Sequence, residues 1–318
     1  MHDGGTKAVV AALAANAGIA LSKFVGFGLT GATSLLAEAV HSVADCGNQT
    51  LLLWGAKKAN RAPTPEHPFG YGRERYFWSF VVALVIFAMG GAFALYEGIQ
   101  KLLHPHPLRS PVIGVGILMF GVVLESLSFR TALREARPLK GRLTWWQFVR
   151  HTKAAELPVI LLEDLGALVG LAVALVGLGL ATLTGEPRYD ALGSVAIGVL
   201  LCVIAGVLSV EMRSLLLGEA APLDQQEEIA AALRSSPHVR AVIHMRTLHL
   251  GPEELLVGAK LEFDPTLDFA SLARAIDVAE TRVRAAVPIA RVIYVEPDVR
   301  RGEGFAGVAE QPQGFIKR

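Results

Sequence analysis

The sequence predicts an α-helical membrane protein with six transmembrane helices, followed by a small α+β domain. Of the 318 residues, 52% are hydrophobic and only 19% are charged, unlike an average soluble domain. Apolar runs about as long as a bilayer crossing recur up to Leu217, after which charges interleave and the runs shorten. We therefore expect a membrane domain at 1–217, a second domain at 218–300 and a disordered tail at 301–318.

The six apolar runs are each close to the roughly 20 residues that cross the hydrocarbon core. The first contains Asn16 and Lys23 and has no cleavage pattern behind it, which predicts a retained helix rather than a signal peptide. Basic residues cluster after the second and fourth runs, so the positive-inside rule places both termini in the cytoplasm. The runs lie at about 8–30, 33–55, 77–100, 111–133, 155–180 and 190–211.

Small residues recur at four-residue intervals in three of these runs. Such stripes are typical of closely packed transmembrane helices, although generic apolar composition explains any single stripe about equally well. Taken together they predict a tight bundle. The stripes are Ala14, Gly18, Ser22 and Gly26; Gly166, Gly170 and Ala174; and Ser194, Gly198, Cys202 and Gly206.

The second domain is expected to follow the order helix, strand, strand, helix, strand. Pro222 begins a helix with acidic residues in its early turns, where the helix dipole favours them. Two strand-like runs, VRAVIHMRTLHL and ELLVGAKLEFD, precede a helix at 268–286, and IARVIYVEP reads as the last strand. This order suits a two-layer α+β unit.

Charged residues in the first two runs are expected to pair. The first hairpin turns near Gly31, which brings Lys23 level with Glu38 and Asn16 level with Asp45. Because lone charges are costly in a bilayer, we predict an ion pair between Lys23 and Glu38 with a structural role. Asn16 is expected to donate a hydrogen bond to the Asp45 carboxylate.

His41 and Asp45 lie four residues apart in the second run, so their side chains share one face of a helix. An ionisable group there costs about 2.5–3.5 kcal/mol, and an imidazole with a carboxylate supplies half of a divalent metal site. In the fifth run, the adjacent acids Glu163 and Asp164 would repel each other unless a cation held them. Glu125, in the fourth run, is expected either to relay protons or to bond a neighbouring helix.

Several motifs occur together in a distinctive order. They are HSVAD in the second run, HPFGYGRERYFWSF before the third, LYEGIQKLLHP after it, the acidic pair in the fifth and the αββαβ tail. In these features the chain resembles the cation diffusion facilitator family of proton-coupled zinc and manganese exporters, and most of all its ZnT9-like branch. The resemblance implies a transporter without a prosthetic group rather than an enzyme. It further implies a multi-pass protein of the cell (inner) membrane and a ferredoxin-like cytosolic domain that forms a homodimer.

The resemblance also implies a tetrahedral transport site, with His41, Asp45 and Asp164 at three of its positions. The family pattern has His or Asp four residues before Asp164, where this chain has Ile160. On a helix, Glu163 and Asp164 flank the direction of Ile160 by roughly 60° and 40°, so we expect Glu163 to be the fourth ligand. One nitrogen and up to three carboxylates suit Zn²⁺ as the substrate, with Mn²⁺ or Fe²⁺ as alternatives.

Metal binds these ligands in their deprotonated forms and displaces protons, with His41 as the natural proton carrier. We therefore expect Zn²⁺/H⁺ antiport out of the cytoplasm by alternating access. The rival from another class is a membrane metalloenzyme, yet no HExxH or comparable motif appears. A metal sensor would need a signalling domain, and the tail resembles none.

Regulatory metal binding is not expected in the cytosolic segments. His67 and His244 match family histidines, whereas Tyr71, Lys260 and Val295 stand where other members carry His. An improvised site would have to use His249, Glu296 and Asp298.

The basic, aromatic segment GRLTWWQFVRHTK lies between the fourth and fifth runs. It is expected to lie on the anionic membrane surface, with Trp145, Trp146 and Phe148 in the interface, rather than to bind nucleic acid.

Overall fold

The computed structural model describes residues 3–300, with side chains from Asn16 onward except Ile86 and Met89. The chain forms two compact units, Met1–Leu217 and Gly218–Arg318. The tail expected to be disordered, 301–318, lies outside the described residues.

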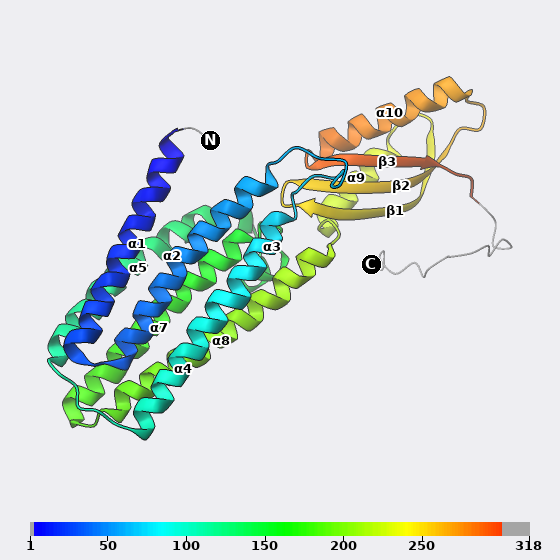
Figure 1. The fold of residues 1–318 in the computed structure, drawn as a ribbon. Coiled ribbons are helices and arrows are strands. Elements are labelled where there is room, and N and C mark those ends of the chain that lie inside the picture. The colour runs from blue at the N-terminus through cyan, green and yellow to red at the C-terminus, as the bar shows by residue number, and fades with distance from the viewer. Residues whose placement is uncertain (1–2, 301–318) are drawn as a thin grey trace. The chain divides into compact units, whose positions relative to one another are not determined.

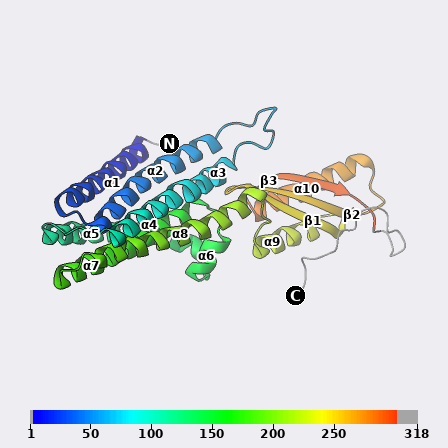
Figure 2. The same ribbon diagram turned by 60° about the horizontal axis from the view of Figure 1, so that its bottom comes forward.

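The first unit is a bundle of long helices that run alongside one another (Figures 1 and 2). A helix covers each of the six apolar runs, and the turn at Gly31 has the positive φ of 68° that glycine accepts readily. The third rod is continuous through a π-helical turn, η1 (Val82–Phe87). The helices are α1 (Asp3–Thr30), α2 (Thr33–Ala59), α3 (Glu74–Val81), α4 (Ala88–Leu103), α5 (Pro111–Lys140), α6 (Trp145–His151), α7 (Glu156–Thr184) and α8 (Arg188–Leu217).

Among the described residues, four helical rods are long and apolar enough to cross a membrane. They are Glu74–Leu103, Pro111–Lys140, Glu156–Thr184 and Arg188–Leu217. Helices α1 and α2 are nearly as long and pack against each other, and α2 also packs against α4, α7 and α8.

Helices α4 and α8 pack with their backbones in contact. A Cβ atom added at Gly198 would lie 2.7 Å from the backbone nitrogen of Leu95, and one at Gly98 would lie 2.8 Å from that of Val195. These distances confirm close packing at the Gly198 position of the small-residue stripe in α8. At Gly206, in the same stripe, an added Cβ would meet no atom within 4 Å.

We expect Gly198→Ala to destabilise the membrane unit by about 1–3 kcal/mol, because the added methyl group must push two helix backbones apart. Gly206→Ala is the matched control, since the same change in the same helix meets open space and should be neutral or slightly stabilising. Thermal unfolding in detergent measures the difference. Equal stability of the two variants would contradict this packing.

The position expected for Phe148 is wrong. Phe148 is 1% exposed and packs on Ala132, Ala136 and Leu161, so it belongs to the protein core rather than to the membrane interface. A capping box at Thr144 starts α6, and Phe148 lies in the first turn of that helix.

Pro158 does not kink the fifth apolar run, because it lies in the first turn of α7, which begins at Glu156. A backbone N–H at that position has no partner within the helix, so proline disrupts nothing there.

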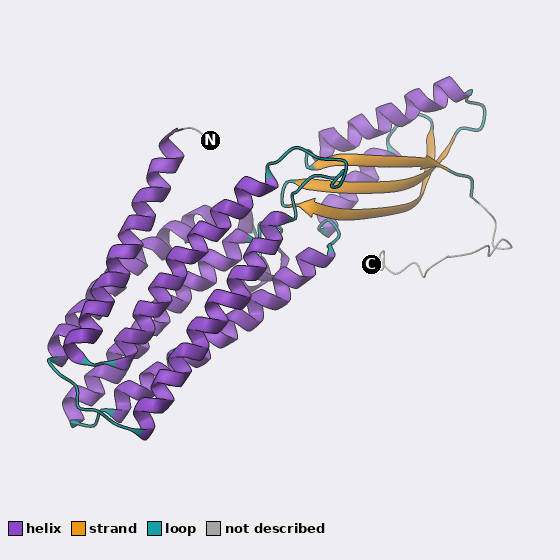
Figure 3. Cartoon of the chain, viewed as in Figure 1, coloured by secondary structure: helices purple, strands orange, loops and turns teal. Residues whose placement is uncertain are grey.

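The second unit has the expected order of two helices and three strands (Figure 3). Strands β1 and β2 are antiparallel, whereas β2 and β3 are parallel, in the order β1-β2-β3. Alternate β2 residues, including Val257 and Leu261, are buried with both helices in one core, which makes two layers. The elements are α9 (Leu223–Arg234), β1 (Val239–Gly251), β2 (Glu254–Phe263), α10 (Phe269–Ala286) and β3 (Ala290–Pro297).

Candidate metal site between helices α2 and α7

His41 and Asp45 face the interior of the bundle on one side of α2. Their exposed fractions are 2% and 7%, and His41 Nδ1 lies 3.6 Å from Asp45 Oδ1. That separation is too long for a hydrogen bond. Both His41 Nε2 and Asp45 Oδ1 are buried without a hydrogen-bond partner among the described residues. Buried polar atoms normally have partners, so these two are available as metal ligands.

The adjacent acids of α7 point to different neighbours. Glu163 is 5% exposed and lies close enough to interact with the Asp45 carboxyl group and the Asn48 amide of α2. Asp164 accepts a hydrogen bond of 3.1 Å from Ser128 of α5. Successive helix side chains are about 100° apart, which explains the divergence. Glu163 is therefore the acid of this pair that contacts α2.

The four predicted ligands do not lie together in one coordination shell. Among the described residues, no three His, Cys, Asp or Glu side chains lie together closely enough to hold an ion. The contacts are pairwise, from His41 to Asp45 and from Asp45 to Glu163, while Asp164 bonds Ser128. Since carboxylates repel one another without a cation, closing the shell requires side-chain rotation toward the ion.

Ile160, which stands at the family's fourth ligand position, is part of the apolar packing. It lies against two clusters of buried hydrophobic side chains, which include Val159 and Leu161. An isoleucine offers no donor atom. The contact between Glu163 and Asp45 therefore supports Glu163 as the substitute ligand.

The predicted ion pair between Lys23 and Glu38 is confirmed. Lys23 Nζ lies 3.1 Å from Glu38 Oε2, and both side chains are fully buried. Lys23 also donates a hydrogen bond of 2.8 Å to Ser42 Oγ, beside His41. A side chain at Gly170 of α7 would collide with the Glu38 carboxylate, so the small residue there makes room for the pair.

Sequence reasoning missed three polar neighbours of this region. Asn48 lies seven residues after His41, and that heptad spacing could have identified it on the same face of α2. Ser42 and Ser128 carry no charge and gave no signal. The hydrogen bond expected from Asn16 does not reach Asp45 Oδ1, which has no partner among the described residues.

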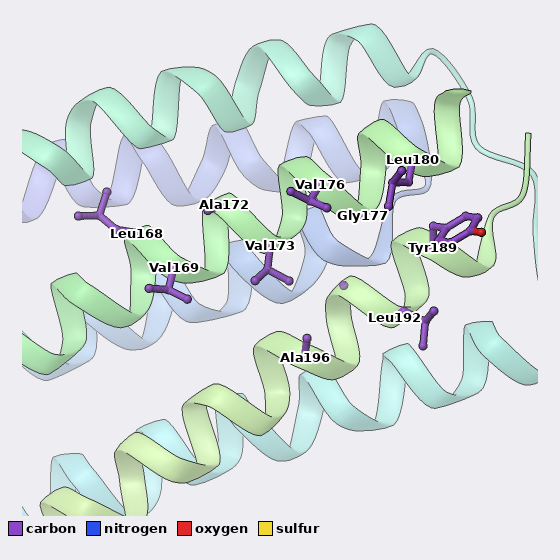
Figure 4. Close-up of a pocket in the computed structure, with 11 residues that line it drawn as sticks. Leu168, Val169, Ala172, Val173, Val176, Gly177, Leu180, Tyr189, Leu192 and Ala196 are labelled. Atoms are coloured by element: carbon purple, nitrogen blue, oxygen red, sulfur yellow. The ribbon is translucent and has the colours of Figure 1, made fainter. Parts of the chain in front are cut away.

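An apolar groove of 580 Å³ lies between α7 and α8 (Figure 4). Its walls are formed by side chains such as Val173, Val176 and Leu192. None of the four predicted ligands lines it, so this groove and the candidate metal site are separate features.

The strand register argues against the improvised metal site of the second unit. His249 pairs with Leu255 on β2, whereas Glu296 pairs with Lys260, five residues further along that strand. At about 3.3 Å per residue, these side chains are too far apart to share an ion. Lys260 Nζ already lies 3.0 Å from Glu296 and 3.6 Å from Asp298. Its hydrogen bond to Glu296 raises the pKa of Lys260 and keeps the ammonium charged.

His67 and His244, the two histidines that match family positions, also contact other side chains. The ring of His67 lies 4.6 Å from that of Tyr71, and Arg246 Nε donates a hydrogen bond of 2.9 Å to His244 Nε2. A guanidinium at the imidazole nitrogen opposes binding of a second cation there. The absence of a regulatory metal site in these segments stays a prediction.

The first unit is a helical bundle of membrane-spanning length with histidine and carboxylates buried between its helices, and comparison with known proteins specifies its family. The family model described as the cation efflux transmembrane domain matches residues 9–217. The chain belongs to this family, the cation diffusion facilitators, which confirms the resemblance found in its motifs. The family is one of cation efflux transporters rather than enzymes, and the chain is accordingly a multi-pass membrane protein.

Relatives of known name agree with this assignment. The chain is 35% identical to the "Proton-coupled zinc antiporter SLC30A9, mitochondrial" of Mus musculus, over 81% of this chain and 46% of that protein. It is 31% identical to "Metal tolerance protein C4" of Arabidopsis thaliana, over 81% and 57% respectively. The chain thus spans about half the length of these curated relatives.

Other matches cover different shares of the chain. "Cation-efflux pump FieF" of Klebsiella pneumoniae is 26% identical over 98% of this chain and 97% of that protein. Among solved structures, a MamM-CTD structure is 22% identical, covers 24% of this chain and 93% of that chain, and has a TM-score of 0.23.

Proposed function

We propose that this protein exports Zn²⁺ from the cytoplasm in exchange for protons, by alternating access at a site formed by His41, Asp45, Glu163 and Asp164. The observation that carries the proposal is the contact of Asp45 and Glu163 across the α2–α7 interface, beside the buried His41. Three carboxylates and one imidazole from two helices supply the charge and donors that a tetrahedral divalent ion needs.

Proton coupling follows from the chemistry of the donors. Zinc binds neutral imidazole and ionised carboxylates, so its arrival displaces whatever protons they carry. When zinc leaves on the other side, the uncompensated carboxylates take up protons again, because burial without a cation disfavours their negative charge. His41 takes up its proton from the water that enters the site on that side. The same residues therefore carry zinc in one direction and protons in the other.

Zinc is favoured over Mn²⁺ and Fe²⁺ for two reasons. An imidazole ligand suits zinc well, whereas a shell of oxygen donors alone would favour harder ions. The Mus musculus relative is named for zinc and protons, and it shares 35% identity with this chain. Export of Mn²⁺ or Fe²⁺ by the same site is the alternative.

The orientation and assembly belong to the same proposal. The loops after α2 and α5 are rich in Lys and Arg, which supports cytoplasmic termini. We place the protein in the cell (inner) membrane and assign homodimer formation to its second unit. The first and second helices cross the bilayer with the other four, because their polar side chains Lys23, Glu38, His41 and Asp45 are buried in the bundle.

A flux assay in sealed vesicles tests the proposal. Purified protein is reconstituted into vesicles that enclose a zinc-sensitive dye. Zinc uptake is then recorded with and without an imposed proton gradient. We expect uptake to accelerate when the lumen is acidic, because outward-moving protons exchange for inward-moving zinc. Parallel runs with Mn²⁺ and Fe²⁺ rank the metals. Zinc flux that ignores the proton gradient would refute the antiport.

A further inference from the structure

A second buried polar cluster lies at the end of the bundle where α1 and α2 join. Asp190, in the first turn of α8, is fully buried and accepts hydrogen bonds from the Thr33 amide at 2.8 Å and the Thr33 hydroxyl at 3.1 Å. It also accepts a hydrogen bond from the Ser34 hydroxyl. Lys101 of α4 completes the cluster, with Nζ 3.1 Å from Asp190 and 2.6 Å from the Gly31 carbonyl oxygen.

Asp190 acts as the cap of α2 from another helix. The residue at the N-cap position of α2, Ala32, has no side chain able to cap it. The Asp190 carboxylate instead accepts the free amide of Thr33, and its negative charge lies at the positive end of the α2 dipole. The first turn of the helix that carries His41 and Asp45 is thus fixed by α8.

The α4–α8 pair to which α2 is tied is a rigid support, because its two backbones touch at Gly98 and Gly198. The cluster is also at the end of α2 away from Lys57 and Lys58, which lie in its last turn beside the basic loop. Thr33 is two helical turns, about 12 Å, from His41. The cluster therefore closes the bundle on the side of the site opposite the basic loops.

We propose that Asp190 and Lys101 form a latch that holds the first turn of α2 against α4 and α8, and that opens when the metal site becomes accessible from the non-cytoplasmic side. This inference rests on the alternating access of the proposed function. An ion pair with 3% and 0% side-chain exposure is strong only while water is excluded. Water that enters when the latch opens weakens the ion pair. The pair therefore favours the closed arrangement strongly and the open one little, which makes them two separate states.

Thiol accessibility tests the latch. Ala37 is buried at 2% exposure, one helical turn from Thr33 and one from His41, so Ala37→Cys reports on the path between the cluster and the site. The reporter is placed in a background with Cys46→Ser and Cys202→Ser, the two native cysteines. An impermeant maleimide is added outside vesicles whose protein orientation has been determined by proteolysis of the tail.

Two latch variants are compared with one control. Asp190→Asn keeps an oxygen for the Thr33 amide but removes the ion pair. The double variant Lys101→Met with Asp190→Asn removes both charges, which avoids leaving one of them buried alone. Arg188→Gln changes an exposed charge of the same helical turn.

We expect the folded fraction of both latch variants to be labelled at least about fivefold faster than the parent, and Arg188→Gln to match the parent. Lower yield with unchanged labelling of the folded fraction would show a merely structural role and overturn the latch. Labelling does not require transport. If the parent moved no zinc, the proposed function would fail while the labelling still decided on the latch.

Discussion

Replacing Glu163 with Gln is expected to reduce zinc transport by at least about 100-fold while the protein still folds. Glutamine keeps the size of the side chain, but it loses the negative charge that faces Asp45 and the metal. The initial rate of zinc uptake into vesicles measures the effect, with circular dichroism and gel filtration to verify folding.

Glu97→Gln, the same change in α4, is the matched control and should transport at the parent rate, because Glu97 lies outside the proposed site. Asp164→Asn and His41→Ala are expected to fold and to fail in transport. If Asp164→Asn abolished transport while Glu163→Gln kept the parent rate, Glu163 would not be the fourth ligand.

Replacing Lys23 with Met is expected to destabilise the membrane unit by about 3–5 kcal/mol, because it leaves the Glu38 carboxylate buried without a counter-charge. The double variant with Glu38→Gln should recover most of this loss, since no lone charge then remains. Thermal unfolding in detergent is measured for the parent, Lys23→Met, Glu38→Gln and the double variant.

Lys57→Met is the control, because Lys57 is exposed at the end of α2 and its replacement should change stability by less than about 0.5 kcal/mol. A Lys23→Met variant as stable as the parent would show that the buried pair does not support the fold.

The sequence predicted those structural features that depend on local periodicity or on symmetry about a turn. Apolar runs of bilayer length located the long helices, and symmetry about Gly31 correctly paired Lys23 with Glu38. The order of the second unit followed from Pro222 and the alternating strands, because one buried face imposes a period of two.

Contacts between distant segments were not predictable in the same way. The sequence shows Asp190 only as an acidic residue at the start of a helix. In the structure it caps α2 at Thr33, 157 positions away. Nothing local shows such a contact. The divergence of Glu163 and Asp164 depends on which helices lie on either side of α7. The burial of Phe148 depends in the same way on its packing against α5 and α7.

The central claim is that the transported ion is held by His41, Asp45, Glu163 and Asp164. Zinc K-edge X-ray absorption of the loaded protein tests it most directly, because the method distinguishes sulfur from nitrogen or oxygen neighbours and counts imidazole rings by their multiple scattering. We predict one imidazole nitrogen and three carboxylate oxygens at about 2.0–2.2 Å, with one oxygen lost or replaced in Glu163→Gln. A shell with two or more imidazoles, or with a sulfur ligand such as Cys46, would contradict the assignment.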